Sequence, residues 1–260
     1  MSEKLQKVLA RAGYGSRRQL EGWIRAGRVE VNGKPASLGD RVGSDDRIRV
    51  DGRKLGQQSR RAPRCRVLLY NKPDHEVCTR SDPQGRPTVF DRLPPLRNSR
   101  WVAVGRLDLN TSGLLLLTND GELANRLMHP SSGIDREYAV RVLGEVGDEQ
   151  LARLREGVEI DGALCRFSDI RYFGGEGANQ WYHVVLMAGR NREVRKLWQS
   201  QGLRVSRLKR VRFGPVFIPS AVKAGRFQEL TQKEIEELRR YAKSVASSRR
   251  RPVGYVQWTP

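Results

Sequence analysis

One carboxylate in this sequence is placed where it could do chemistry. Asp108 lies in a polar turn between two apolar, strand-like segments, Trp101–Val104 and Leu114–Thr118. Enzymes often hold reactive groups in such loops, because the flanking strands give the loop a rigid base. An ionised carboxylate in that position can act as a nucleophile. For an isolated aspartate, the alternative is a turn residue that accepts hydrogen bonds from its own backbone.

A basic segment later in the chain could keep such a carboxylate ionised. A carboxyl group in a desolvated pocket tends to take up a proton unless a positive charge lies nearby. The segment 189–197, with the sequence GRNREVRKL, supplies several positive charges. From Arg190 to Arg212 there are nine lysines and arginines and one acid, Glu193. The alternative for this segment is a helix face that binds phosphate groups.

The overall charge predicts a polyanionic partner. The 260 residues include 49 lysines and arginines against 29 aspartates and glutamates, which gives a net charge of +20. RNA or DNA is the first expectation for so basic a chain. A membrane surface is the alternative, but no basic amphipathic helix with a bulky aromatic face stands out. We also expect no membrane span, because no apolar stretch approaches the roughly 18 residues that one needs.

The cysteines predict a reducing compartment. The three cysteines form no CxxC pair, and their scattered spacing is typical of free thiols in a cytoplasmic protein. The run that starts at His75 begins like the zinc-protease motif HExxH but lacks its second histidine. We therefore expect no metal site.

The first 50 residues are predicted to form a small domain of two helices and short strands. Apolar residues between 5 and 12 have helical spacing, which predicts the first helix. Ser16 with Gln19 is a capping-box pattern that predicts the start of the second. The Asn-Gly pair at 32–33 predicts a hairpin turn between strands.

The rest of the chain is predicted to hold a linker at 51–64, a large domain at 65–246 and a basic, flexible tail at 247–260. Strands are expected at 66–70, 101–104, 113–118, 137–142, 164–173, 181–188 and 204–212, and helices at 121–128, 148–156, 191–200 and 232–246. Runs of strands with few helices between them favour an α+β domain with a mainly antiparallel sheet. The tail could contact a nucleic acid or only keep the protein soluble.

Two segments resemble known families. Residues 105–121, GRLDLNTSGLLLLTNDG, resemble the active-site segment of pseudouridine synthases of the small- and large-subunit ribosomal RNA group. Residues 4–33 resemble an S4-type RNA-binding domain. The resemblance implies an S4-like domain followed by an α+β catalytic domain that isomerises a uridine within RNA to pseudouridine. Such a reaction involves no redox change, so we expect no cofactor.

The same resemblance implies roles for particular side chains. Asp108 is expected to be catalytic, with Arg195 as its positively charged partner. Tyr138 is expected to pack against the flipped base and to assist proton removal at C5. Arg106 is expected to fill the gap left by that base or to contact its phosphate. The other residues expected to bind RNA are Lys4, Lys7, Arg11, Arg17, Arg18, Arg190, Arg192 and Lys196.

The strand before the catalytic loop also carries a family motif. The run Tyr70–Pro73 resembles the opening strand motif of the family, and Lys72 within it is expected to be structural or to face RNA. His75 stands where relatives usually have a glycine, which leaves the conformation of this turn open.

Segments 82–91 and 174–182 resemble the large-subunit members of the group. They imply a uridine in a 23S ribosomal RNA stem-loop near the peptidyl transferase centre. No feature of the sequence indicates an oligomer, so a monomer is the default expectation. One alternative is a target in small-subunit ribosomal RNA or transfer RNA, because those enzymes share the catalytic motifs. The other alternative is a non-catalytic RNA-binding factor for ribosome assembly, which the basic charge and the S4-like domain also fit.

Overall fold

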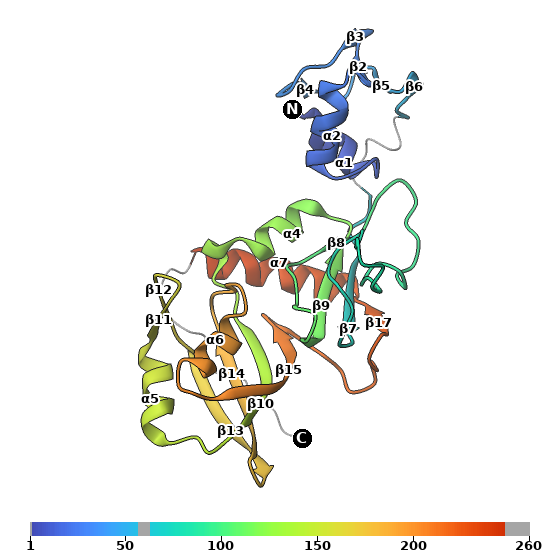
Figure 1. Cartoon of the computed structure of the whole chain (residues 1–260). Coiled ribbons are helices and arrows are strands. Elements are labelled where there is room, and N and C mark those ends of the chain that lie inside the picture. Colours follow the sequence, from blue (N-terminus) through green and yellow to red (C-terminus); the bar gives the residue numbers. More distant parts are fainter. Residues whose placement is uncertain (1, 57–62, 248–260) are drawn as a thin grey trace.

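The computed structural model describes residues 2–56 and 63–247, which form a small amino-terminal domain and a larger domain (Figure 1). Residues 57–62 of the expected linker and 248–260 of the expected tail lie outside the described residues.

The small domain begins with the two predicted helices, α1 (Leu5–Arg11) and α2 (Arg17–Arg25). The hydroxyl of Ser16 accepts a hydrogen bond from the backbone N–H of Gln19 at 3.1 Å. This bond satisfies one of the free donors at the start of α2. The predicted capping residue is therefore confirmed.

Short strands complete the small domain. The strand order β3-β2-β5-β6 joins β2 (Val29–Val31), β3 (Lys34–Pro35), β5 (Ile48–Val50) and β6 (Arg53–Lys54), while β1 (Glu3–Lys4) pairs with β4 (Arg41–Val42). Asn32 and Gly33 have φ values of 54° and 82°, as an Asn-Gly hairpin turn requires. The expected linker is wrong for residues 53–55, because β6 pairs with β5 and Leu55 is buried in the small domain.

The large domain is built on one sheet with the strand order β13-β14-β10-β15-β9-β7-β17. Its strands are β7 (Val67–Lys72), β9 (Ser112–Thr118), β10 (Arg136–Leu143), β13 (Asp169–Glu176), β14 (Asn179–Leu186), β15 (Arg204–Phe213) and β17 (Phe227–Glu229). Two short strands, β8 (Val102–Ala103) and β16 (Val216–Phe217), pair with β9 and β15. Only β9 and β15 run parallel among the described strands, so the predicted, mainly antiparallel α+β fold is confirmed.

The single strand expected at 164–173 is wrong. The chain instead forms β12 (Ala163–Cys165), which pairs with β11 (Val158–Ile160), and then begins β13 at Asp169. Between the two strands Phe167 is buried, and its N–H donates to the carbonyl of Leu154 at 3.0 Å. Burial of this ring bends the chain out of strand geometry.

Helices cover both faces of the sheet. They are α4 (Gly121–Met128), α5 (Asp148–Glu156), α6 (Glu193–Gln199) and α7 (Gln232–Ser247), with a 3-10 turn at Pro130–Ser132. Alternate side chains of β9 point to opposite faces. Leu115 therefore packs in the same core as Trp198 of α6, and Leu116 in the same core as Leu238 of α7. The sheet is thus covered by packed helices on both faces.

Candidate active site

Asp108 lies in the loop between β8 and β9, at one end of the central sheet. The carbonyl of Asp108 accepts a hydrogen bond from the N–H of Thr111 at 3.0 Å, which closes a tight turn. At Gly113, where the loop enters β9, φ is +98° and an added Cβ would lie 2.9 Å from the backbone nitrogen of Arg210. Only glycine lets the loop approach β15 this closely.

Lys72, the last residue of β7, supports this loop through hydrogen bonds to its backbone. Its side chain is 0% exposed, and its Nζ donates to the carbonyls of Leu109 at 3.3 Å and Thr111 at 2.9 Å. A third bond reaches the carbonyl of Pro73 at 3.0 Å. Burial lowers the pKa of Lys72, while the charges of nearby acids, Asp108 among them, act in the opposite direction. Of the two expectations for Lys72, the structural one is confirmed.

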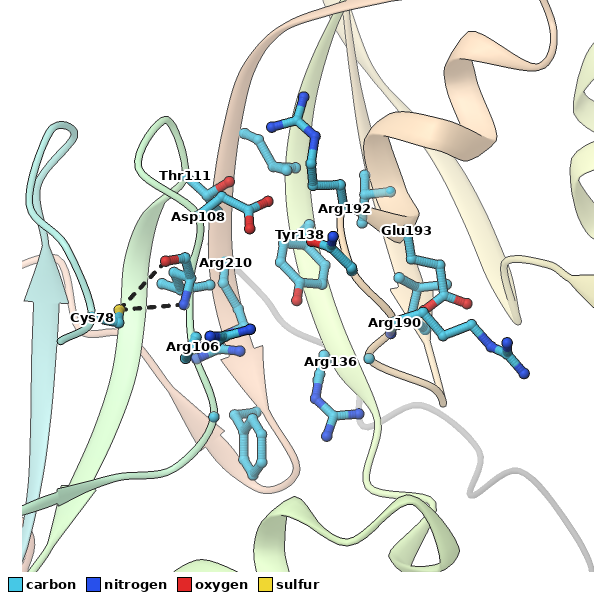
Figure 2. Close-up of a pocket in the computed structure, with 18 of the residues that line it drawn as sticks. Cys78, Arg106, Asp108, Thr111, Arg136, Tyr138, Arg190, Arg192, Glu193 and Arg210 are labelled. Atoms are coloured by element: carbon cyan, nitrogen blue, oxygen red, sulfur yellow. Dashed lines mark hydrogen bonds between the residues drawn. The ribbon is translucent and has the colours of Figure 1, made fainter. Parts of the chain in front are cut away.

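The loop borders a pocket of about 580 Å³ (Figure 2). Asp108 lies on one side of this pocket with the ring of Tyr138 next to it, and the guanidinium groups of Arg106, Arg136 and Arg210 gather beyond the tyrosine hydroxyl. The predicted residues Asp108, Tyr138 and Arg106 are thus brought together. The pocket has an anionic side and a cationic side.

Two arginines of the pocket were missed by the sequence analysis. Arg210 is 2% exposed; its Nε donates to the carbonyl of Leu114 at 2.7 Å, and its Nη2 is buried without a hydrogen-bond partner. Burial lowers the pKa of Arg136, whose Nη1 donates to the carbonyl of Ala188 at 3.1 Å. A signal for Arg136 was present, because residues two apart in a strand share a face and Tyr138 was already placed on the site.

Arg195 does not form the expected ion pair with Asp108. Its Nη2 donates to the carbonyl of Asn110 at 2.6 Å, and its Nη1 donates to the carbonyl of Val205 at 3.0 Å. Burial lowers the pKa of Arg195, while the charge of Asp108 acts to raise it. Because both terminal nitrogens donate to carbonyls, Arg195 holds the backbone of the Asp108 loop and acts on Asp108 itself through the field of its charge.

The basic residues expected to bind RNA fall into three groups. Arg106, Arg190 and Arg192 line the pocket, while Lys4, Arg17 and Arg18 are exposed on the small domain. The other three are held in ion pairs: Lys7 with Glu3 and Glu122, Arg11 with Glu3, and Lys196 with Asp161. Glu3, Glu122 and Asp161 partly neutralise these three cations, and RNA binding by them stays a prediction.

A second groove of about 1140 Å³ also borders the Asp108 loop. It is lined by Asn110 and Ser112 of the loop, by Arg195, and by basic residues of β15 such as Arg207 and Lys209. Arg195 thus stands beside both the loop and this positively charged groove.

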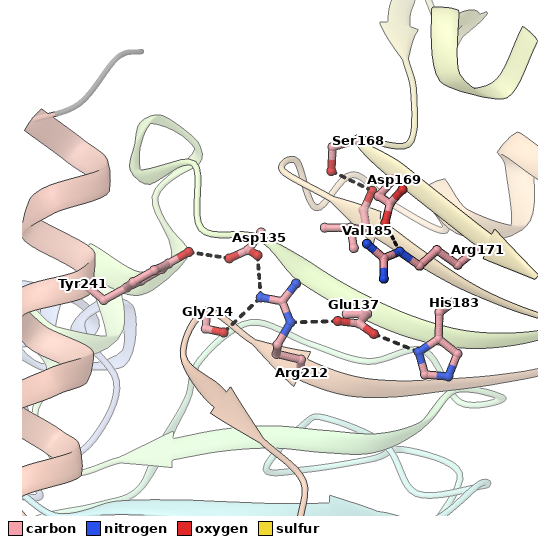
Figure 3. Close-up of polar contacts among 10 residues, drawn as sticks. All are labelled: Asp135, Glu137, Ser168, Asp169, Arg171, His183, Val185, Arg212, Gly214 and Tyr241. Atoms are coloured by element: carbon pink, nitrogen blue, oxygen red, sulfur yellow. Dashed lines mark hydrogen bonds and ion pairs between the residues drawn. The ribbon is translucent and has the colours of Figure 1, made fainter. Parts of the chain in front are cut away.

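A polar network supports the back of β10, the strand that presents Arg136 and Tyr138 to the pocket (Figure 3). Arg212 donates to Glu137 at 2.8 Å and also pairs with Asp135, which accepts a hydrogen bond from the hydroxyl of Tyr241 at 2.6 Å. His183 bonds the other oxygen of Glu137 at 2.8 Å. Burial acts to raise the pKa of Glu137, but these partners hold it below its usual value.

The described residues contain no group of three or more histidine, cysteine, aspartate or glutamate side chains arranged to hold a metal ion. Within the same residues, no helix has the length and apolar character needed to cross a membrane.

Family models identify the class of protein to which this fold and site belong. The family model for RNA pseudouridylate synthase matches residues 66–200, and the model for the S4 domain matches residues 3–48. The chain therefore belongs to the RNA pseudouridylate synthase family and carries an amino-terminal S4 domain.

Two relatives in sequence and one solved structure show which members of the family this chain resembles. The chain is 63% identical to "Ribosomal large subunit pseudouridine synthase B" of Pseudomonas aeruginosa, over 92% of this chain and 62% of that protein. It is 58% identical to the Vibrio cholerae protein of the same name, over 92% of this chain and 75% of the relative. A crystal structure of a pseudouridylate synthase superposes with a TM-score of 0.63 at 26% identity, covering 90% of this chain and 99% of the other.

Proposed function

We propose that this protein isomerises a specific uridine of 23S ribosomal RNA to pseudouridine, with Asp108 as the nucleophile. One observation carries the proposal: Asp108 borders a pocket next to the buried Tyr138, and a group of arginines lies beyond the tyrosine hydroxyl (Figure 2). Family membership and the names of the relatives support it.

The reaction balances without a further reagent. The bond from N1 of uracil to C1′ of the ribose breaks, the base rotates, and a bond forms from C5 to C1′. C5 loses a proton and N1 gains one, so that substrate and product are isomers. Asp108 adds to C1′ of the sugar or to C6 of the base, and holds the detached fragment until the new bond forms.

The other side chains of the pocket have roles that suit an extruded base. A volume of about 580 Å³ lies in the range of small-molecule sites. Tyr138 packs against the uracil ring and assists proton removal at C5. Arg210 has a buried Nη2 without a partner, which donates to a uracil oxygen. The exposed Arg106 at the pocket fills the gap that the base leaves in the RNA.

RNA around the target contacts the basic surfaces beside the loop. Arg190 and Arg192 at the pocket, and Arg207 and Lys209 in the second groove, bind phosphate groups of the strand that carries the uridine. A splayed stem-loop suits this arrangement, because bases in an intact A-form duplex are poorly accessible. The enzyme is proposed to act as a monomer in the cytoplasm, and sedimentation of the RNA-bound protein tests the stoichiometry.

A pseudouridine map of ribosomal RNA tests the proposal. Cells with and without the gene are compared, and the deletion is complemented with wild type, Asp108→Asn or the control Asp148→Asn. Asp148 is an exposed residue at the start of α5, so it receives the same chemical change outside the site. One 23S site should be lost on deletion and restored by wild type and the control alone.

Other results of the same map identify the alternatives. A lost site in small-subunit ribosomal RNA or transfer RNA would keep the reaction and change the target. An unchanged map, or rescue by Asp108→Asn, would contradict the reaction. The non-catalytic assembly factor would then be favoured, since the S4 domain and the net charge of +20 support RNA binding by themselves.

A further inference from the structure

The small domain is docked on the large domain by a close backbone contact. Gly13, in the turn between α1 and α2, has a φ of +90°, and a Cβ added to it would lie 3.1 Å from the backbone nitrogen of Ser99. A second contact is the ion pair between Lys7 of α1 and Glu122 of α4. These contacts bring the start of α2 against the segment that leads into β8.

Three arginines converge at this junction. Arg17 is the first residue of α2, and Arg100 follows Ser99 directly. Arg80 donates to the carbonyl of Trp101, and its guanidinium lies 4.3 Å from the centre of the Phe90 ring. Burial lowers the pKa of Arg100, and the charges of Arg80 and Arg17 lower it further. The Arg100 guanidinium therefore lies within reach of the positive charges of both Arg80 and Arg17.

The three arginines have no carboxylate partner, unlike some cations of the small domain. Arg11 pairs with Glu3 at 2.7 Å, and Arg28 pairs with Asp51 at 2.6 Å. Among the described residues, no carboxylate lies within ion-pair distance of Arg17, Arg80 or Arg100; all the ion pairs found there involve other cations. A cluster of like charges without a counter-charge costs free energy, and a bound anion removes that cost.

We propose that Arg17, Arg80 and Arg100 form a binding site for the phosphate backbone of the substrate RNA, at the place where that RNA crosses from the catalytic domain to the S4 domain. This proposal rests on the proposed function. Guanidinium groups suit phosphate, because their planar N–H donors match two of its oxygens at once.

The position of the cluster relative to the pocket favours the same RNA molecule. Arg80 is two residues from Cys78, which lines the pocket, so their Cα atoms are at most about 7 Å apart. Arg100 is six residues from Arg106 of the pocket, which limits that separation to about 20 Å. A short RNA stem with its uridine in the pocket can reach both. The site would then recognise the distance between a backbone phosphate and the target uridine, and not the base sequence of the RNA.

The test is the salt dependence of RNA binding by the full chain. The probe is a transcript of the 23S ribosomal RNA region around the peptidyl transferase centre, titrated by fluorescence anisotropy at several salt concentrations. Arg80→Gln/Arg100→Gln is compared with wild type and with Arg49→Gln. Arg49 is an exposed arginine of β5, at the end of the small domain that faces away from the catalytic domain (Figure 1).

Each phosphate contact contributes about 0.7 to 0.9 to the slope of log affinity against log salt. The double variant should therefore lose about 1.4 to 1.8 from this slope, and at least about tenfold in affinity near 0.1 M salt. Arg49→Gln should keep the slope within about 0.3 of wild type. A slope and affinity equal to wild type in the double variant would overturn the proposal, and so would an equal loss in the control. An acidic protein partner would then become the alternative occupant.

Thermal unfolding separates binding from a structural role. Since the charges of Arg80 and Arg17 act against that of Arg100 in the free protein, the midpoint of Arg100→Gln should equal or exceed that of wild type. A lower midpoint with an unchanged salt slope would assign Arg100 to packing and overturn the proposal. The binding site and the proposed function can be contradicted separately. A transcript that is bound through the cluster but never isomerised would contradict the reaction and leave this site in place.

Discussion

Arg195 and Asn110 are joined by a hydrogen bond from the guanidinium Nη2 to the backbone carbonyl, at 2.6 Å. The same guanidinium donates a second hydrogen bond to the carbonyl of Val205 at 3.0 Å, so one side chain links the Asp108 loop to β15. Asn110 is two residues from Asp108. The position of Asp108 is therefore coupled to α6 through the main chain, while the charge of Arg195 contributes to the field around Asp108.

Replacing Arg195 with lysine separates these two contributions. Arg195→Lys keeps the positive charge but cannot hold both carbonyls in one plane. If the bonds position the loop, the single-turnover rate of pseudouridine formation should fall at least about tenfold, which corresponds to about 1.4 kcal/mol. RNA affinity should change less than threefold, because the charge remains. A wild-type rate in Arg195→Lys would show that charge alone suffices.

Arg210 offers a second test of the pocket. Its Nη2 is buried without a partner, and Arg210→Lys keeps the charge while it removes this donor. A hydrogen bond from a charged group contributes about 1.5 to 3 kcal/mol, so the single-turnover rate should fall by roughly 10- to 100-fold. The control Arg166→Lys makes the same change at an exposed arginine outside the pocket and the second groove, and should leave the rate within about twofold of wild type. Equal rates for Arg210→Lys and wild type would remove Arg210 from the reaction.

The sequence predicted the parts of the site that depend on local pattern. The loop around Asp108 is recognisable because apolar strands flank it, and Ser16 marks a helix start through its own side chain. The partners of Arg195 could not be predicted, since Val205 and Asn110 meet it only through the packing of α6 against β15. The parallel pairing of β9 with β15 is equally hidden, because it joins residues about 100 positions apart. Burial of Arg210 follows from that pairing.

His75 shows how a departure from the family pattern becomes a physical prediction. Its φ is +69°, in the left-handed region that costs a non-glycine residue about 1 to 2 kcal/mol. His75→Gly removes that strain but adds about 0.5 to 1 kcal/mol of chain entropy to lose on folding. The free energy of unfolding in urea should therefore rise by about 0.5 kcal/mol. His75→Ala, which removes the ring and keeps the strain, should not be stabilised, and a gain in the alanine variant would attribute the effect to the imidazole.

The network behind β10 predicts how the free energy of unfolding falls at acidic pH. The partners His183 and Arg212 hold the pKa of Glu137 below 4.5, although burial acts to raise it. A carboxyl group whose pKa is lower in the folded state stabilises the protein above its unfolded pKa, and this stabilisation is lost as the pH falls through the folded value. In wild type, the free energy of unfolding should decrease below about pH 4.5.

Glu137→Gln should cost about 1 to 2 kcal/mol at pH 7, because Arg212 and His183 lose a charged acceptor. The variant should also show a shallower decline between pH 4.5 and pH 3 than wild type. Glu159→Gln, an exposed change on β11, serves as the control and should follow the wild-type curve. Parallel curves for wild type and Glu137→Gln would show that this carboxylate is not linked to folding, and the support of Tyr138 from behind the sheet would then have to come from apolar packing alone.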